Sequence, residues 1–371
     1  MTTTPATDKR LPRVDALTGL RWWAAFFVFL YHMLVLAPLP TVSAVLGQGY
    51  LGVTFFFVLS GFVLTWSWSA RVTTSTFYWR RFARIYPSHI AALILAIPVF
   101  YTLSAVPDAT WLKPFDAGIL ALSVVLLQGW FLNPAILFSG NPAAWTLTCE
   151  AFFYALHPFF SRILTPLIRR GALVFALITV VVAFLYRALA LAFPDAWFSA
   201  APQPLVHLPE FVLGMGLAWA FRQGWRPRLP IFVGLAAIAA VVIAIVLLPG
   251  FMPGSLPAFL ITGFGTELFA VACALAIIAA AQRTVAGKHS AFASPLQVRL
   301  GEWSYAFYLV HASFVYIALR IFGVQPVSWW NLLWFAALLC IALAAAAALH
   351  HLVEKPFERR MRAWKDAREA S

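Results

Sequence analysis

The feature that most constrains this chain is a succession of apolar runs, each long enough to cross a bilayer. A transmembrane helix needs about 20 mostly apolar residues, and such runs recur along the whole 371-residue chain. They lie at 16–37, 50–69, 87–106, 144–162, 172–193, 206–222, 230–248, 259–282, 303–322 and 330–352. We therefore predict an all-α polytopic membrane helix bundle of about ten transmembrane helices, formed by a single domain over 1–371 with short tails at 1–15 and 353–371.

Composition and charge agree with a membrane protein. Hydrophobic residues make up 63% of the chain and charged residues 11%, against roughly 25% charged residues in soluble domains. The net charge of +13 comes from basic residues gathered at the ends of apolar runs, which is typical of juxtamembrane anchoring and not of nucleic-acid binding. The cysteines are odd in number and lack ligand spacing, so we expect packing residues and no metal site: Cys149, Cys273 and Cys340.

The basic residues also predict the topology, because cytoplasmic loops are enriched in Lys and Arg. All the basic clusters fall on the cytoplasmic side only if 107–143 starts and ends outside. The apolar run at 117–132 is then a re-entrant or interfacial segment. The protein is expected in the cytoplasmic (inner) membrane, with both termini on the cytoplasmic side. The clusters are Lys9, Arg10 and Arg13; Arg71, Arg80, Arg81 and Arg84; Arg162, Arg169 and Arg170; Arg222, Arg226 and Arg228; Arg283, Lys288 and Arg299; and Arg359, Arg360, Arg362 and Arg368.

Arg21 and His32 lie in the first apolar run, "RWWAAFFVFLYH". Eleven residues of α-helix return to within about 20° of the starting direction and rise roughly 16 Å, so both side chains share one face at different depths. Intramembrane ionisable residues are candidates for function. A snorkelling arginine with a histidine hydrogen-bonded inside the bundle is the structural alternative.

A basic segment follows the second run, with Arg80, Arg81 and Arg84 in "FYWRRFARIYP". Arg80 and Arg84 are four residues apart and share a helical face. Guanidinium groups bind phosphate through two parallel hydrogen bonds, so this segment suits a phosphorylated ligand. Ordinary anchoring at the cytoplasmic boundary is the alternative.

Further polar residues lie inside later runs. Glu150 and Tyr154 are one turn apart in "WTLTCEAFFYALHPFF". A carboxylate in lipid requires a partner, so we expect Glu150 either to orient His32 or to pair with Arg187 or Arg320. Ser304 and His311 occur in "LGEWSYAFYLVHASF", where a buried histidine is more often a packing residue than a chemical one. Glu210 and Glu267 are weaker candidates.

Together these stretches resemble the acyltransferase 3 family of integral-membrane O-acyltransferases from about residue 13 to 357. The resemblance is carried by Arg21 and His32 at their spacing, and by "FFFVLSGFVL", "RRFARIYP", "WTLTCEAFFYALHP", "LPEFVLGMGLAW", "SYAFYLVH" and "VEKP". It implies transfer of an acyl group, usually acetyl from acetyl-CoA, to a hydroxyl. It further implies catalysis by His32 with Arg21 as partner, and CoA-phosphate binding by Arg80, Arg81 and Arg84. Glu150 matches the family's glutamate, although Cys149 and Ala151 depart from the usual acidic-rich motif.

The implied chemistry needs no permanently bound cofactor, because the thioester of acyl-CoA is already activated. His32 is either a general base or a transient acyl carrier. The acceptor is either a carbohydrate or a lipophilic natural product such as a macrolide, with a weak preference for the lipophilic class. A transporter that uses the buried Arg, His and Glu residues as a substrate or proton pathway is the competing hypothesis.

Overall fold

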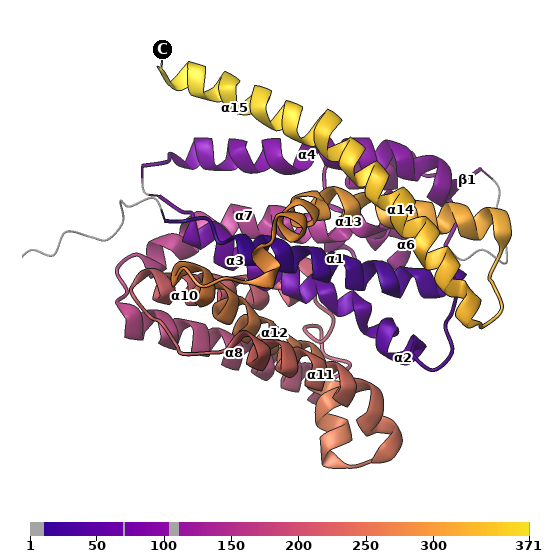
Figure 1. Ribbon diagram of the computed structural model, residues 1–371, viewed down its shortest axis with the longest axis horizontal. Helices are drawn as coiled ribbons and strands as arrows, with labels where there is room; N and C mark the ends of the chain where they lie inside the picture. The colour runs from indigo at the N-terminus through magenta and orange to yellow at the C-terminus, as the bar shows by residue number, and fades with distance from the viewer. Residues whose placement is uncertain (1–10, 70, 104–110, 371) are drawn as a thin grey trace, which may run out of the picture.

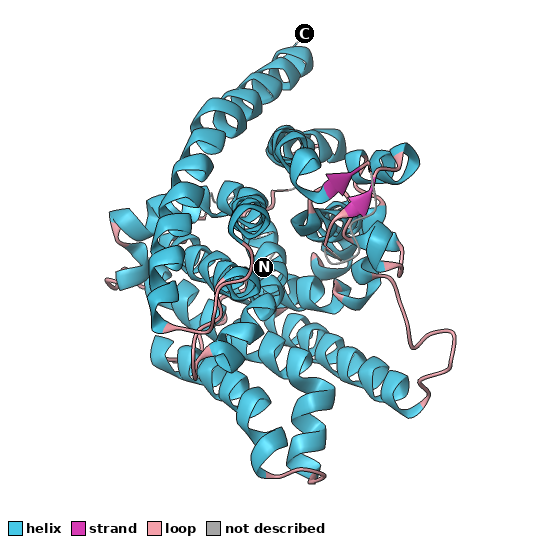
Figure 2. Cartoon of the chain, turned by 90° about the vertical axis from the view of Figure 1, so that its right-hand side faces the viewer, coloured by secondary structure: helices cyan, strands magenta, loops and turns pink. Residues whose placement is uncertain are grey.

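The computed structural model describes residues 11–69, 71–103 and 111–370, and this part of the chain is a helix bundle (Figures 1 and 2). The long helices are α1 Asp15–Leu36, α3 Gly52–Trp66, α4 Thr74–Phe100, α7 Trp145–Leu164, α8 Arg169–Ala192, α10 Leu208–Arg222, α11 Ile231–Phe251, α12 Leu256–Val285, α13 Pro295–Phe322, α14 Leu332–Leu349 and α15 Lys355–Ala370. Helices satisfy their own backbone hydrogen bonds, as an apolar environment requires.

Short elements connect the long helices. They are α2 Ser43–Leu46, η1 Gly47–Leu51, α5 Ala117–Val124, η2 Gln128–Trp130, α6 Pro134–Leu137, η3 Pro142–Ala144, α9 Gln203–Val206, η4 Ala291–Ala293, η5 Trp329–Asn331 and the π-helical turn η6 His350–Glu354. Two short parallel strands, β1 Tyr101–Thr102 and β2 Lys113–Pro114, pair with Tyr101 opposite Lys113 (Figure 2).

The predicted spans are confirmed as helices, except that the third, 87–106, is helical only to Phe100 and then enters β1. Residues 104–106 of that run, and residues 1–10 of the predicted N-terminal tail, lie outside the described part of the chain. Within the described residues, nine helical segments are long and apolar enough to cross a membrane. The fourth predicted run forms the 20-residue α7, which is more polar than those nine. At 117–132 the chain forms only the eight-residue α5 and the turn η2. Since α5 rises about 12 Å, this segment does not span a bilayer.

The C-terminal segment, which was predicted as a tail at 353–371, forms a helix. After α14 the chain continues through η6 into the 16-residue α15, which lies along α4 and extends past the rest of the bundle (Figure 1). Its Trp364 ring packs against Trp79 of α4 at 5.0 Å. A charged segment that the sequence assigned to a tail therefore covers the basic segment of α4.

Glycines allow the central helices to pack closely. A Cβ atom on Gly61 of α3 would lie 1.9 Å from the Phe211 carbonyl oxygen of α10, and one on Gly214 would lie 2.0 Å from the Val58 carbonyl oxygen. Small residues let helix backbones approach in this way. Gly301 of α13 meets the Thr18 carbonyl of α1 in the same manner. This contact sets α1 and α13 side by side in parallel, which positions the residues described next.

Candidate active site

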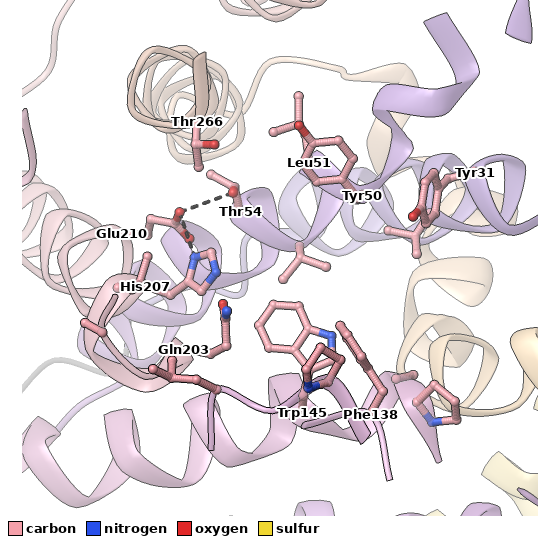
Figure 3. Close-up of a pocket in the computed structure, with 18 of the residues that line it drawn as sticks. Tyr31, Tyr50, Leu51, Thr54, Phe138, Trp145, Gln203, His207, Glu210 and Thr266 are labelled. Carbon is pink, nitrogen blue, oxygen red and sulfur yellow. Dashed lines mark hydrogen bonds and ion pairs between the residues drawn. The ribbon is translucent and has the colours of Figure 1, made fainter. Parts of the chain in front are cut away.

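A cavity of about 1110 Å³ opens between the helices. It is lined by residues from α1, α3, α7, α8, α10, α12 and α13, and by the segment from 111 to 142. Its volume is at the upper end of the range for sites that enclose small molecules. The lining is rich in aromatic side chains such as Tyr50, Phe138 and Trp145 (Figure 3). His32 also contributes to its wall.

His32 pairs with His311 across the α1–α13 contact. His311 Nδ1 lies 3.1 Å from the Phe307 carbonyl oxygen, so Nδ1 carries the hydrogen and Nε2 of the neutral ring is an acceptor. His32 Nδ1 lies 3.3 Å from that Nε2 and 3.0 Å from the Val28 carbonyl oxygen. Both neighbours are acceptors, so the hydrogen-bond network assigns the proton of neutral His32 to Nδ1.

This tautomer leaves the lone pair of His32 on Nε2. Among the described residues no hydrogen bond reaches that atom, and His32 lines the cavity. The imidazole is thus arranged to accept a proton from a molecule in the cavity while His311 holds the other side of the ring. From the sequence, His311 was expected to be a packing residue or a secondary candidate for the site. In the structure it is a hydrogen-bond partner of His32.

A second polar group faces the same cavity at the start of α10. His207 Nδ1 lies 3.0 Å from Glu210 Oε1, and Thr54 Oγ1 donates to the same oxygen at 3.2 Å (Figure 3). From the sequence, Glu210 was only a weaker candidate for the site, and His207 and Thr54 were not predicted to belong to it. The sequence does contain a signal that would have predicted His207. The stretch "HLPE" places His207 and Glu210 three residues apart at the start of a helix, and therefore on one face.

A second group of predicted site residues surrounds Arg21, which lies eleven residues before His32 on α1. Arg21 interacts electrostatically with Glu150, Tyr154 and Arg84, and Glu150 also with Arg81. We call Arg21, Arg81, Arg84, Glu150 and Tyr154 the arginine cluster. The Tyr154 hydroxyl donates to Glu150 Oε2 at 3.0 Å. Roughly 16 Å of α1 separates Arg21 from His32, so the cluster and the cavity histidines form two distinct sites.

The suggested partners of Glu150 outside this cluster are not its neighbours. Arg187 Nε donates to the Gly263 carbonyl at 2.7 Å, and Arg320 Nη1 donates to the Pro98 carbonyl at 3.2 Å. His32 is held by Val28 and His311, as described above. Glu150 interacts electrostatically with Arg21, Arg84 and Arg81, but it forms no ion pair within the described residues. The cations that influence Glu150 thus come from α1 and α4, and the suggested pairing with His32, Arg187 or Arg320 is not seen there.

The three arginines of α4 differ in their surroundings. Arg84 Nη1 lies 2.5 Å from Glu354 Oε1 and 3.2 Å from Glu358 Oε2. Arg80 Nη2 lies 3.4 Å from Asp366 Oδ1. Arg81 forms no ion pair within the described residues, and its Nε atom has no hydrogen-bond partner there. Of the three guanidinium groups, that of Arg81 is therefore the least committed.

Ser304 is a packing residue of α13. Its side chain is fully buried, and its hydroxyl donates to the Gly301 carbonyl at 2.8 Å. That carbonyl belongs to the glycine that meets α1 at Thr18. The serine therefore stabilises the helix contact that brings His311 to His32, and it does not line the cavity.

Comparison with known proteins identifies the family of the chain. The family model described as "Acyltransferase domain", that of the acyltransferase 3 family, matches residues 14–351. The chain belongs to the acyltransferase 3 family. As a family member built from apolar helices, it is a multi-pass membrane acyltransferase, and the matched range contains both the cavity histidines and the arginine cluster.

Individual relatives cover different parts of this acyltransferase 3 chain. Acyltransferase MdmB of Streptomyces mycarofaciens is 34% identical, with 94% of this chain and 93% of MdmB covered. Peptidoglycan O-acetyltransferase OatA of Listeria monocytogenes is 28% identical over 43% of this chain and 25% of OatA. Nodulation protein 10 of Rhizobium leguminosarum is 32% identical over 34% of this chain and 36% of that protein. No solved structure gives a significant match.

Proposed function

We propose that this membrane acyltransferase moves an acyl group, foremost acetyl, from acyl-CoA to a hydroxyl of an acceptor held in the cavity, with His32 as general base. The observation that carries the proposal is the tautomer of His32, because Nδ1 is committed to Val28 and His311 while Nε2 has no partner among the described residues. An alcohol is a weak nucleophile, so removal of its proton in the transition state gives a large acceleration.

The reaction balances without a further reagent. His32 Nε2 takes the hydroxyl proton as the acceptor oxygen attacks the thioester carbonyl, and the carbon–sulfur bond then breaks. The imidazolium returns the proton to the departing CoA thiolate, so the products are an ester and CoA. His311 Nε2 accepts a hydrogen bond from Nδ1–H of His32, which orients the ring and stabilises its charged form.

The donor side of the proposal rests on the arginine cluster. Guanidinium groups bind phosphate well, and Arg81 is the α4 arginine without an ion pair among the described residues. With α1 starting at the cytoplasmic face of the inner membrane, the nucleotide of cytoplasmic acyl-CoA binds at Arg21 and Arg81. The pantetheine arm then extends along α1 toward His32.

The cavity lining favours a lipophilic acceptor over a highly charged glycan. Aromatic residues from several elements form its walls, including Tyr31, Tyr50 and Trp145 (Figure 3). Tyr308 also lines the cavity. Apolar and aromatic surface binds apolar molecules, while a few polar groups fix their orientation. An acceptor with an apolar body and a reacting hydroxyl fits this description.

The test is acyl transfer from radiolabelled acetyl-CoA by purified protein in lipid nanodiscs, with sugar and lipophilic alcohols as acceptors. Wild type is expected to form labelled ester, and His32→Ala to lose roughly 100- to 10,000-fold in kcat while still inserting and eluting as a folded protein. Label retained on wild-type protein before acceptor is added would replace direct transfer with an acyl-enzyme route. Full activity of His32→Ala would overturn the role of His32. Folded protein that neither binds nor turns over CoA would favour the transport hypothesis.

A further inference from the structure

The polar group at the start of α10 contains carboxylate oxygens that nothing in the described structure satisfies. Glu210 is 7% exposed, and its Oε1 atom accepts from Thr54 and contacts His207. Its Oε2 atom has no hydrogen-bond partner. Glu267 of α12 also lines the cavity, and its Oε2 atom is likewise without a partner. Leaving a buried carboxylate oxygen unpaired is costly, so these atoms need a donor from outside the chain.

The two carboxylates act as one site, which we call the acidic subsite: Glu210, Glu267, His207 and Thr54. Glu267 interacts electrostatically with both Glu210 and His207, although it comes from α12 and they lie at the start of α10. Figure 3 shows Glu210, His207 and Thr54 at one wall of the cavity, with Tyr31 at the opposite end of the same view. The His32 ring lies 5.0 Å from that of Tyr31, so the acidic subsite is separate from the end of the cavity that holds His32.

Neither glutamate of this subsite forms an ion pair with an arginine or lysine within the described residues. Arg187 of α8 interacts electrostatically with Glu267, but its Nε atom is committed to the Gly263 carbonyl. No ion pair joins Arg187 to either glutamate within the described residues. The other cavity cation, Lys113, donates to the Phe138 carbonyl on a different wall. Two acidic side chains therefore lie near one guanidinium that forms an ion pair with neither of them.

We propose that the acidic subsite binds a protonated amine of the acceptor, so that the enzyme selects lipophilic alcohols that also carry a basic amine. An ammonium group supplies both the missing donor hydrogens and the missing positive charge, whereas a neutral hydroxyl supplies only a hydrogen. The aromatic wall adds to the attraction, since Trp145 lies with its ring 5.6 Å from His207 and aromatic faces attract cations. This inference deepens the proposed function and rests on it.

The test uses ω-(dimethylamino)alkan-1-ols of graded chain length, each paired with the isosteric branched alkanol in which CH replaces nitrogen. Both members of a pair carry the same reacting hydroxyl. Wild-type protein is compared with Glu210→Gln, Glu267→Gln and the matched control Glu302→Gln. Glu302 pairs with Arg13 at 2.9 Å outside the cavity, so this control carries the same chemical change elsewhere.

Wild type and the control are expected to prefer the amine by about tenfold or more in kcat/KM, and the subsite variants to reduce that ratio by roughly tenfold. A second measurement is equilibrium binding of the radiolabelled amino alcohol without CoA, with the isostere as competitor. A preference near one in wild type, or one retained by both subsite variants, would overturn the proposal. If Glu210→Gln fails to fold, Glu267→Gln alone decides.

The two measurements separate this inference from the proposed function. Amine-selective binding that the subsite variants lose, in a protein that never transfers an acyl group, would retain the subsite and reject the acyl-CoA reaction. Acyl transfer to both members of each pair at equal efficiency would retain the reaction and reject the amine subsite.

Discussion

The contact between α4 and the C-terminal helix differs from the cavity in how its charges are satisfied. Arg84 and Arg80 are each matched by acidic residues of the 354–366 segment. In the cavity, His32 Nε2 and the Oε2 atoms of Glu210 and Glu267 have no partner among the described residues. Paired charges hold helices together, whereas unpaired polar atoms beside a cavity await a ligand. The same residue types therefore hold helices together at one site, and at the other they have free atoms for the binding that we propose.

The strongest test of this contrast is Arg84→Ala. The Glu354 side chain is fully buried, and removing the partner of a buried charge costs about 3 to 5 kcal/mol. We expect a marked loss of thermal stability, measured by fluorescence-detected unfolding in detergent. The double variant Arg84→Met with Glu354→Gln removes both charges and is expected to recover most of that stability. An Arg84→Ala protein as stable as wild type, with a weakened response to acyl-CoA, would place Arg84 in the donor site instead.

His311→Ala sharpens the description of the cavity side. Loss of the acceptor for His32 Nδ1–H is expected to lower kcat by roughly 10- to 100-fold with little change in the KM for either substrate. His311→Gln, whose side-chain oxygen can accept the same hydrogen bond, is expected to restore part of kcat. The pH dependence of kcat is measured alongside, because a positioning role changes the titration of His32 and a packing role does not. Equal kcat values for the alanine and glutamine variants would contradict the positioning role.

Arg81→Ala tests whether the uncommitted arginine binds the donor. We expect the KM for acyl-CoA to rise by about tenfold, as for loss of one charge-assisted phosphate contact, with the fold retained. Arg80→Ala is the matched control, because Arg80 is already paired with Asp366 at the surface. An equal rise in the KM for acyl-CoA in both variants would mean that the arginines contribute only general positive charge.

The smallest expected effect concerns Lys113, in the segment between two spans. Burial lowers the pKa of Lys113 to about 8 from 10.5, because the charged form is poorly solvated there. Between pH 8 and 10.5 the unfolded chain therefore binds more protons at this residue than the folded chain does, and stability rises with pH in that window. Lys113→Met is expected to remove this increment, measured as the difference in unfolding temperature between pH 8 and 10. The same pH increment in both proteins would show that Lys113 is fully solvated.

Local sequence information was sufficient for the apolar helices and for the shared face of one pair of candidate residues. The apolar runs became the helices because an amide group in lipid has no other way to be satisfied. Arg21 and His32 share a face because helical periodicity is a local property. The run at 117–132 was assigned to a non-spanning segment from loop charge, and the short α5 confirms this.

Tertiary structure decided which distant residues meet. His32 and His311 are 279 positions apart, and only the close α1–α13 contact at Gly301 brings them together. The acidic segment that neutralises Arg84 lies more than two hundred positions away, in a region that the sequence assigned to a tail. Glu150 and Arg21, which are far apart in the sequence, also interact only because the tertiary structure brings their helices near each other. By itself the sequence determined where the long apolar helices form and which side chains share a face of one helix. Which faces meet, and hence which polar atoms remain unpaired beside the cavity, depends on close packing between helices that no local pattern encodes.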